Sequence, residues 1–414
     1  MKNQKNVSPI HILVVSPFFY PHIGGSQRYI EELYVHMMRQ QKNLRVTVLT
    51  YNTDQALERE YYHGLSIYRI PCWHILTGQF ALPNLIALAA ILIRFSSKHF
   101  DFVHTHIRFF DATWWAWAYA KMIGAKSIFT EHVATHPVHP NTIVRKIAKV
   151  VDMTIAKISI DHYDLVTTTN TPAKLFLETT LGIHHPVTLS YGGVDTSFFA
   201  PKQSGKKHIP HTSVKLSSRD TVITYAGRII WSKGIMTFVK AIKTMKTMPH
   251  VHFVFAGTGD LLPWLKNTIH REGLTEKVSI TGPLTPKEVR SLFDSTDIFI
   301  HPSHHNEGFP NVLLEAAASG CVVVTTNNAG TYEMFQDKKT AYFIPMKNDR
   351  AITKAVQEIR KNPSKTHMMT KAARLDIQNR FDWQIIARQF FHLLKHTSQT
   401  APKPTWYPTY GIVS

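Results

Sequence analysis

The sequence contains only two cysteines, Cys72 and Cys321, which lie far apart in a chain of 414 residues. So few cysteines exclude a disulfide framework and a cysteine-ligated zinc site, and they are typical of a reducing compartment. Acidic residues are also scarce, because 28 Asp and Glu stand against 47 Lys and Arg and leave a net charge of +19. Such an excess of positive charge favours an anionic partner.

Long apolar runs are missing as well. The first ten residues, MKNQKNVSPI, have no apolar signal-peptide core, and the most apolar segment, residues 80–95, is short and interrupted by Pro83 and Asn84. We therefore expect residues 80–95 to form a buried helix. The protein is expected to be cytoplasmic, with a peripheral position on the inner face of a membrane as the alternative.

The positive charge is unevenly distributed, because residues 1–200 carry a net +5 and residues 201–414 a net +14. Residues 201–220 hold much of it, together with the Pro, Ser and Gly content of a linker or exposed loop. A solvated loop is the simplest interpretation. Docking on an anionic membrane surface is the alternative, to which the basic helical stretch 141–158 would add. Nucleic acid is not expected, because no recognised nucleic-acid motif accompanies the charge.

Short apolar runs alternate with segments of helical length along the whole chain. The first half contains HILVVS, VTVLT, FVHTH, KSIFTE and LVTTT, and the second contains VITYAG, HFVFAG, VSITG, IFIHPS and CVVVTT. Apolar strands separated by helices indicate parallel sheets buried on both faces, so we predict two doubly wound α/β domains. The predicted division is residues 1–200, 201–380, and 381–414 as a C-terminal helix and tail. Ligands of such folds bind beyond the carboxyl ends of the strands.

Several residues of the first half follow predicted strands. The pair Gly24-Gly25 precedes a helix that would start near residue 26 or 27, where a ligand can approach the backbone closely, although a tight turn explains the pair equally well. His104 and His106 end one strand, and Glu131-His132 ends the next. In a chain with 25 histidines most are structural, but a position at a strand's carboxyl end favours His106 and His132 as functional residues.

The second half places Arg228 after a strand and Lys233 five residues later, before a helix. Two cations there can neutralise the charge of a departing diphosphate, although solvated surface charge is the simpler interpretation. Gly257 and Gly259 follow the next strand without the third glycine of a dinucleotide fingerprint, which disfavours a nicotinamide enzyme.

The stretch EGFPNVLLE holds two carboxylates, Glu307 and Glu315, on either side of Pro310. Because proline suits the first turn of a helix, Glu307 is predicted to lie in the preceding loop and Glu315 in the second helical turn. The N–H groups at the helix start would lie between them, as an anion site flanked by two acids. A surface acid and an ordinary helical glutamate are the simpler alternative.

Taken together these segments resemble the retaining glycosyltransferases of family 4, which have the GT-B architecture of two Rossmann-like domains facing across a cleft. The resemblance spans nearly the whole chain and rests on motifs in a fixed order. They are the Gly24-Gly25 loop, FTEH ending at His132, GGVDTSFF (192–199), AGRIIWSKGI (226–235), HPSHHNEGFPNVLLEAAASG (301–320) and RFDWQIIARQF (380–390).

The resemblance implies transfer of a hexosyl group from a nucleotide diphosphate sugar to a glycan or a lipid-linked acceptor. Glu315 would bind the ribose, Glu307 would face the transferred sugar, and His132 would contact that sugar; with Arg228 and Lys233, which would hold the diphosphate, His132 and Glu307 form the catalytic set. The implied donor-binding residues are Gly24, Gly25, Arg228, Lys233, Gly282, Glu307, Gly308, Phe309, Pro310, Asn311, Val312 and Glu315. No metal cofactor is expected, and a uridine diphosphate sugar is favoured over a guanosine one.

Retention of the anomeric configuration follows from the resemblance and not from residue spacing. A double displacement would need a carboxylate nucleophile, and none is convincing, so we expect front-face attack with the leaving phosphate accepting the acceptor's proton. Two alternatives stay open: a GT-B sugar-nucleotide epimerase, and a non-catalytic sugar-nucleotide-binding protein.

Overall fold

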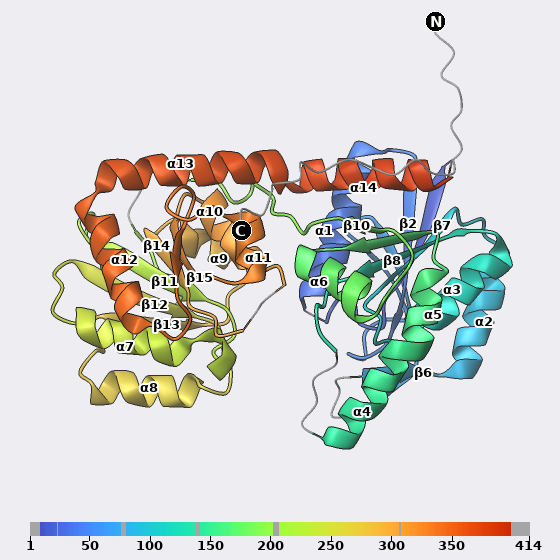
Figure 1. Cartoon of the computed structure of the whole chain (residues 1–414), viewed down its shortest axis with the longest axis horizontal. Helices are drawn as coiled ribbons and strands as arrows, with labels where there is room; N and C mark the ends of the chain where they lie inside the picture. The colour runs from blue at the N-terminus through green and yellow to red at the C-terminus, as the bar shows by residue number, and fades with distance from the viewer. Residues whose placement is uncertain are drawn as a thin grey trace, which may run out of the picture. The chain divides into compact units, whose positions relative to one another are not determined.

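The structure is a computed structural model that describes residues 9–22, 24–75, 80–136, 141–201, 207–305 and 308–398. The chain divides into two compact units, which are coloured mainly from blue to green and from green to red in Figure 1. Unit 1 comprises residues 1–191 and 386–414, and unit 2 comprises residues 192–385. Each unit is built around its own sheet.

Unit 1 holds an eight-stranded sheet in the order β10-β9-β8-β7-β1-β2-β4-β3, in which only the β3–β4 pair is antiparallel. Its strands are β1 (Ile10–Val15), β2 (Leu44–Tyr51), β3 (Arg59–Tyr62), β4 (Leu65–Ile70), β7 (Phe102–His106), β8 (Lys126–Glu131), β9 (Leu165–Thr168) and β10 (Val187–Leu189). A separate hairpin is formed by β5 (Cys72–Ile75) and β6 (Phe80–Pro83). The five strands expected in this half are all present as parallel neighbours.

The helices of unit 1 cover its sheet. They are α1 (Gly25–Gln40), α2 (Leu85–Ser96), α3 (Ala112–Ile123), α4 (Thr142–Val151), the π-helical turn η1 (Asp152–Ala156), α5 (Lys157–Asp161), α6 (Thr171–Leu175) and the π-helical turn η2 (Phe176–Thr180). One buried cluster joins α2 and α3 to β1 and β2 through Leu88, Ala116, Leu13 and Leu49. A second joins α5 and η2 to β8 and β9 through Ile160, Leu177 and Phe129.

Unit 2 holds a six-stranded parallel sheet in the order β13-β12-β11-β14-β15-β16. Its strands are β11 (Thr221–Ala226), β12 (Val251–Ala256), β13 (Val278–Gly282), β14 (Ile298–His301), β15 (Val322–Thr326) and β16 (Tyr342–Ile344). Its helices are η3 (Trp231–Lys233, a 3-10 turn), α7 (Ile235–Met245), α8 (Leu262–Arg271), α9 (Pro286–Phe293), α10 (Asn311–Ala318), α11 (Ala329–Met334), α12 (Asp349–Lys361) and α13 (Pro363–Arg380). Helices α7, α8 and α12 share one buried cluster on a face of the sheet (Figure 1), whereas α10 and α13 contact each other and β15.

The observed division falls at residues 191/192 and 385/386, whereas the sequence predicted 200/201 and 380/381. The difference arises because the GGVD segment pairs with residues 381–383. Val194 N–H donates to the Phe381 carbonyl at 2.8 Å, and Trp383 N–H donates to the Val194 carbonyl at 3.1 Å. A Cβ on Gly193 would lie 2.8 Å from the Trp383 ring, so only glycine allows this approach. Helix α14 (Trp383–Ser398) therefore begins in unit 2, and its residues from Ile386 onwards belong to unit 1.

The structure corrects the expectation for one segment of the chain and adds detail to the expectation for another. Residues 80–95 do not form a buried helix, because they divide into β6 and the amphipathic helix α2, whose Leu85 and Ile86 are 71% and 83% exposed. In the described part of the chain, no helix combines the length and the apolar character needed to cross a bilayer. Residues 207–220, the described part of the predicted exposed loop, form no helix or strand and are mostly exposed or partly exposed, and they are anchored on unit 2, where Lys207 binds Asp297 and His211 binds Glu288.

Candidate functional site

The carboxyl ends of the unit 2 strands bring the predicted phosphate-binding residues to one edge of the sheet. Arg228 follows β11 and is exposed, while Lys233 ends η3 and is partly buried. The β11–α7 loop has a defined shape, because the Tyr225 hydroxyl donates to the Arg228 carbonyl at 2.7 Å. Both cations are therefore carried by an ordered turn at the expected edge of the sheet.

The turn that carries Lys233 is joined to the loop after β14, the neighbouring strand. His304 N–H donates to the Ser232 carbonyl at 2.8 Å, and the His304 ring lies 2.9 Å from the Thr237 hydroxyl. Gly234 has φ +72°, and a Cβ there would lie 1.9 Å from the Pro302 carbonyl oxygen. The glycine before α7 thus allows the two loops to touch backbone to backbone.

Gly257 and Gly259, which form only part of a dinucleotide fingerprint, likewise allow close packing of backbone against backbone. A Cβ on Gly257 would lie 2.0 Å from the Gly227 carbonyl oxygen, and one on Gly259 would lie 2.5 Å from that of Ile229. The loop after β12 therefore supports the loop that carries Arg228. Gly282, at the end of β13, has φ +77°, and its carbonyl accepts a bond from Gly257 N–H at 2.8 Å.

Helix α10 begins at Asn311 with Pro310 at its N-cap, so Glu315 lies in the second turn as predicted. No side chain among the described residues caps this helix, which leaves the N–H groups of Asn311 and Val312 at an uncapped N-terminus. Glu315 itself is buried, at 4% exposure. Glu307 lies outside the described residues.

Phe309 fixes the approach to α10. Its ring lies 5.6 Å from that of Phe381, and it lies against Gly192, where a Cβ would come within 3.1 Å of Phe309 and 3.0 Å of the Asn311 side chain. Gly308, Phe309, Pro310, Asn311 and Val312 are all partly exposed. The GGVD segment and the GFPN segment, far apart in sequence, therefore form one packed unit beside the start of α10.

In unit 1 the Gly24-Gly25 pair lies at the start of α1. Neither glycine has a positive φ, so the pair is not there to make a left-handed turn. Gly24 is the N-cap in an extended conformation, and a Cβ on Gly25 would meet nothing within 4 Å. Among the described residues no side chain caps α1, and its first turn holds no acid. The structure thus leaves open space at Gly25 beside an uncapped helix N-terminus.

His132 and His106 meet at the carboxyl ends of the adjacent strands β8 and β7. His132 Nε2 lies 3.2 Å from His106 Nδ1, and the Tyr29 ring of α1 lies edge-on to His132 at 5.0 Å. Burial lowers the pKa of His106 well below its usual range and lowers the pKa of His132 to about 4. Both rings are therefore neutral near pH 7.

The hydrogen-bond partners of the ring nitrogens show which of the two rings donates the proton between them. His106 Nε2 is buried and has no hydrogen-bond partner among the described residues. A buried N–H without a partner costs about 1–3 kcal/mol, so the His106 proton belongs on Nδ1, from which it is donated to His132 Nε2. His132 then carries its own proton on Nδ1. It presents a hydrogen-bond donor and is not poised as a base.

His104 is a structural residue. It is fully buried, its Nδ1 lies 2.5 Å from the Tyr34 hydroxyl, and its Nε2 lies 2.7 Å from the Thr130 hydroxyl. The Phe390 ring of α14 stacks on it at 5.4 Å. Desolvation lowers its pKa well below the usual range, which keeps the ring neutral.

A buried ionic cluster holds the loop that carries His132. Glu131 Oε1 accepts the N–H groups of His132 and Val133 at 2.8 and 2.9 Å, and Glu131 Oε2 accepts Arg108 Nη1 at 2.7 Å. Arg108 Nε also donates to Asp152 at 3.1 Å, and its Nη1 donates to the Val133 carbonyl. Both Glu131 oxygens are thus occupied, and its carboxylate orients the loop.

Sequence reasoning did not identify Tyr29, Arg108 or Asp152. Tyr29 has no motif of its own, and its contact with His132 follows only from the packing of α1 on the sheet. Arg108 stands two residues after His106 and could have been questioned, because a cation inside an apolar region needs a buried partner. Among the described residues, no group of three or more His, Cys, Asp or Glu side chains could hold a metal ion.

Comparison with known proteins finds a matching family for each half of the chain. The model described as "Glycosyltransferase Family 4" matches residues 23–198, and the model described as "Glycosyl transferases group 1" matches residues 210–376. The chain is a GT-B glycosyltransferase. Its two-domain GT-B fold is shared with HepE of Anabaena, solved in complex with UDP (TM-score 0.70, 16% identity, 94% of this chain and 99% of that one), and with sucrose-phosphate synthase of Thermosynechococcus elongatus (TM-score 0.73, 18% identity, 95% and 100%).

Sequence relatives of this glycosyltransferase extend over most of both chains. A phosphatidylinositol N-acetylglucosaminyltransferase subunit of Arabidopsis thaliana is 25% identical over 92% of this chain and 80% of its own length. The GPI3 subunit of the phosphatidylinositol N-acetylglucosaminyltransferase from Saccharomyces cerevisiae is 22% identical over 94% and 84%. The uncharacterized glycosyltransferase MJ1069 of Methanocaldococcus jannaschii is 22% identical over 92% and 97%.

Proposed function

We propose that this glycosyltransferase is a family 4 enzyme that transfers a hexosyl group from a uridine diphosphate sugar to a lipid-linked acceptor, with retention of configuration and without a metal ion. The donor assignment rests on the groups that lie together at the carboxyl ends of the unit 2 strands. There the turn with Lys233 is locked to the loop after β14, which leads to the uncapped start of α10 and to the buried Glu315.

The division of labour at this edge follows from the chemistry of each group. Arg228, Lys233 and the N–H groups of Asn311 and Val312 are donors suited to a diphosphate whose charge grows as the sugar leaves. Glu315, an acceptor in the second turn of α10, suits the ribose hydroxyls. The UDP complex of HepE supports uridine as the base, and Glu307 and His132 are assigned to the transferred sugar by resemblance.

Retention by front-face attack is supported by the state of Glu131, the carboxylate next to His132. A nucleophile for double displacement needs an available carboxylate oxygen, but Arg108 and two backbone N–H groups occupy both oxygens of Glu131. His132, as a donor through Nδ1, can hydrogen-bond a sugar hydroxyl. The leaving phosphate then accepts the acceptor's proton as the new glycosidic bond forms.

A lipid-linked acceptor is supported by the surface of α4 and α5. Ile143, Ile147 and Val150 lie on one face of α4 and are 68%, 59% and 62% exposed, and Ile158 of α5 is 60% exposed. Arg145, Lys146 and Lys149 flank this face, and no acid lies between residues 132 and 151. An exposed apolar stripe with basic flanks is suited to the interface of an anionic membrane.

The donor assignment is tested by thermal shift with UDP and GDP, followed by turnover. A nucleotide at ~100 times its dissociation constant should stabilise unit 2 by about 2.7 kcal/mol, and UDP should do so at lower concentration than GDP. Release of UDP from a uridine diphosphate sugar should require a lipid-linked acceptor and persist in EDTA. Lys233→Ala should lower both kcat and donor affinity. Release of nucleotide with no acceptor, or a normal kcat for Lys233→Ala, contradicts the proposal.

The membrane surface is tested by flotation on vesicles that contain an anionic lipid. Ile143→Ser with Ile147→Ser should abolish flotation, and raised salt should weaken it. Leu85→Ser with Ile86→Ser on α2 is the matched control, because those side chains are equally apolar and exposed but lack a basic flank. Loss of flotation in the α2 pair alone, or no flotation of the wild type, refutes docking through α4.

A further inference from the structure

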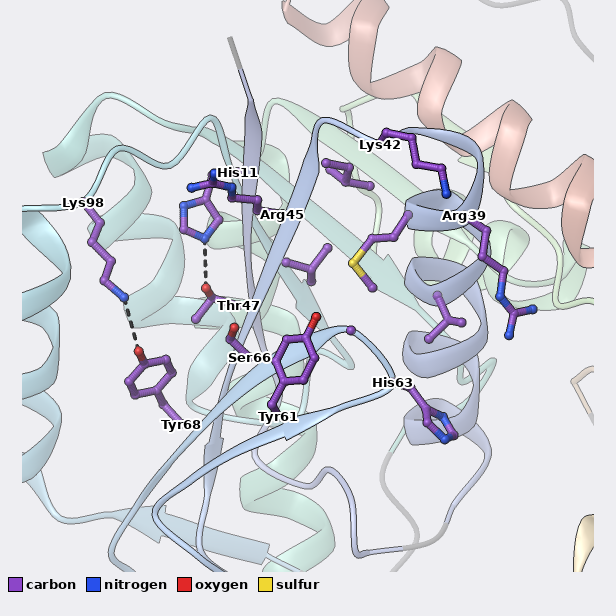
Figure 2. A pocket seen from close by; sticks show the side chains of 15 residues that line it. His11, Arg39, Lys42, Arg45, Thr47, Tyr61, His63, Ser66, Tyr68 and Lys98 are labelled. Carbon is purple, nitrogen blue, oxygen red and sulfur yellow. Dashed lines mark hydrogen bonds between the residues drawn. The ribbon is translucent and has the colours of Figure 1, made fainter.

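A hollow of unit 1 lies at the amino ends of its parallel strands, at the opposite end of the sheet from His132. It has a volume of about 710 Å³, within the range of small-molecule sites. Its walls come from the start of β1 and β2, the end of α1, the β3–β4 hairpin and the segment after α2 (Figure 2). The amino ends of parallel strands form this end of the sheet, so the hollow is separated from the carboxyl-end residues by the length of the sheet, roughly 20 Å.

The lining of this hollow is strongly basic. Arg39, Lys42, Arg45 and Lys98 contribute four positive charges, and none of the 15 lining residues is acidic. Figure 2 shows Lys98 and Arg45 on one side and Arg39 and Lys42 on the other, so the cations surround the space. Cations near the ends of α1 and α2 are common, because they interact favourably with helix C-termini, but this does not account for Arg45 on β2.

None of these four cations pairs with a carboxylate within the described ranges, unlike Lys121 and Lys126 of the same unit. Lys121 and Lys126 both pair with Asp164, at 2.8 and 3.3 Å. By contrast, neither the Lys42 nor the Arg45 side chain has a hydrogen-bond or ion-pair partner within the described ranges. Lys98 donates to the Tyr68 hydroxyl at 3.3 Å and lies over the rings of Tyr68 and Phe95, at 4.9 and 5.0 Å from their centroids.

The floor of the hollow provides uncharged hydrogen-bonding groups. Thr47 of β2 is paired in register with Ser66 of β4, which is paired with Tyr61 of β3, so three hydroxyl side chains cross adjacent strands in one row. His11 of β1 lies 2.9 Å from the Thr47 hydroxyl. Its pKa is lowered first by burial and then by the positive charges of Lys98 and Arg45, while the carboxylate of Asp101 acts in the opposite direction.

The hollow lies beside a part of β2 that is not paired with the β3–β4 hairpin. Strand β2 pairs with β1 from Leu44 onwards but with β4 only from Thr47 onwards. Residues 44–46 therefore have no strand partner on the side of the hairpin, and the hollow occupies this side. Phosphate oxygens are strong acceptors, and guanidinium, ammonium and hydroxyl donors around one space are the groups that bind them.

We propose that this hollow is a binding site for a small phosphorylated ligand, separate from the donor site. The ligand would place its phosphate between Arg45 and Lys42, and its uncharged part over Thr47, Ser66 and Tyr61. A free phosphorylated metabolite and the phosphate of a lipid headgroup share this chemistry. We infer the free metabolite because Tyr61 is the only described lining residue with an exposed large hydrophobic side chain, whereas docking on a bilayer needs an exposed apolar surface.

The test uses full-length protein with Arg228→Ala and Lys233→Ala, so that the donor site contributes little, and inorganic pyrophosphate as the probe in calorimetric titration. Lys42→Glu with Arg45→Glu should lower pyrophosphate affinity by at least about tenfold. Lys266→Glu with Lys354→Glu, two exposed lysines of unit 2, makes the same change of net charge and should leave the affinity unchanged.

Equal losses in the two pairs, or no effect of the hollow pair, would show non-specific attraction and overturn the proposal. The lipid alternative is separated by flotation on phosphatidylcholine vesicles that contain phosphatidic acid. Vesicle binding that depends on Lys42 and Arg45, without binding of free pyrophosphate, refutes the metabolite site. All four changed side chains are exposed, so unaltered thermal unfolding is the expected folding check.

Discussion

His106 Nδ1 lies 3.2 Å from His132 Nε2, and this contact sets which nitrogen of His132 carries the proton. The two residues end adjacent parallel strands, so the pairing is a direct product of sheet order. A second ring nitrogen of His106 is buried without a partner among the described residues, which fixes the direction of the hydrogen bond. His106 is therefore a positioning residue for His132.

Replacing His106 by Phe should preserve the packing but release His132 from a single tautomer. We expect kcat to fall by roughly tenfold, the equivalent of one hydrogen bond, with little change in KM for the donor. His106→Asn, whose amide can donate from nearly the same place, should restore part of the loss. Nitrogen NMR of His132 supplies the direct measurement: a ring still protonated at Nδ1 in His106→Phe refutes the positioning role.

Arg108 should carry much of the stability of the loop after β8. It is fully buried between Glu131 and Asp152, and removal of one member of a buried ionic cluster leaves an unpaired charge. Arg108→Met should lower the free energy of unfolding by about 3–5 kcal/mol. The matched control is Lys121→Met, which breaks a partly exposed pair with Asp164 and should cost less than about 1 kcal/mol. Equal costs in denaturant unfolding would contradict the assignment.

Stability should fall as the pH is lowered from about 6.5, because burial depresses the pKa values of His104, His106 and His132. Above that pH the histidines are neutral in both the folded and the unfolded chain. Below it the unfolded chain binds protons that the folded chain does not bind. The loss continues down to the folded pKa, about 4 for His132. His104→Gln should reduce the slope by about 1.4 kcal/mol per pH unit. An unchanged slope in urea titrations between pH 6.5 and 5 refutes this linkage.

The sequence predicted the parallel strands because their signal is local. Strands such as β1 and β15 are continuous apolar runs that need burial on both faces, and all ten expected strands are present. The edge strands β3, β10 and β16 and the hairpin β5–β6 were missed, because three or four residues give too short a pattern, and β4, a strand of six residues, was missed as well. The exposure of α2 was also missed, because composition alone cannot distinguish an apolar helix in a core from one on a surface.

Residues at strand ends were predictable, but the contacts among them were not. Arg228, Lys233 and Glu315 lie where the order of strands and helices puts them, at the carboxyl edge of the unit 2 sheet or in the helix that follows. The pairing of GGVD with residues 381–383 joins segments almost 190 residues apart, which no local pattern records. The role of Gly257 and Gly259 was likewise hidden, because it depends on the close approach of a neighbouring loop.

Gly234→Ala should weaken donor binding although residue 234 is assigned no contact with the donor. The new methyl group would meet the Pro302 carbonyl and part the Lys233 turn from the loop after β14. Gly273→Ala is the matched control, because Gly273 has a similar φ of +64° but open space around its Cβ position. The control should cost only the left-handed strain, roughly 1–2 kcal/mol, and keep full nucleotide affinity. Equal nucleotide affinities in the two variants would show that the contact between the two loops does not affect donor binding, contrary to the prediction.

The last prediction concerns Glu315 and Glu307, to which the proposed function gives different parts of the donor. Glu315 is fixed in the second turn of α10 and is assigned to the ribose, which does not react, so Glu315→Ala should weaken the donor and free nucleotide diphosphate alike, by about 1–3 kcal/mol. Glu307 is assigned to the transferred sugar, so Glu307→Ala should leave nucleotide affinity nearly intact and reduce kcat. Calorimetry with the nucleotide diphosphate and turnover with the donor measure the two effects separately. Equal losses of nucleotide affinity in both variants would show that the two acids do not divide the ligand in this way.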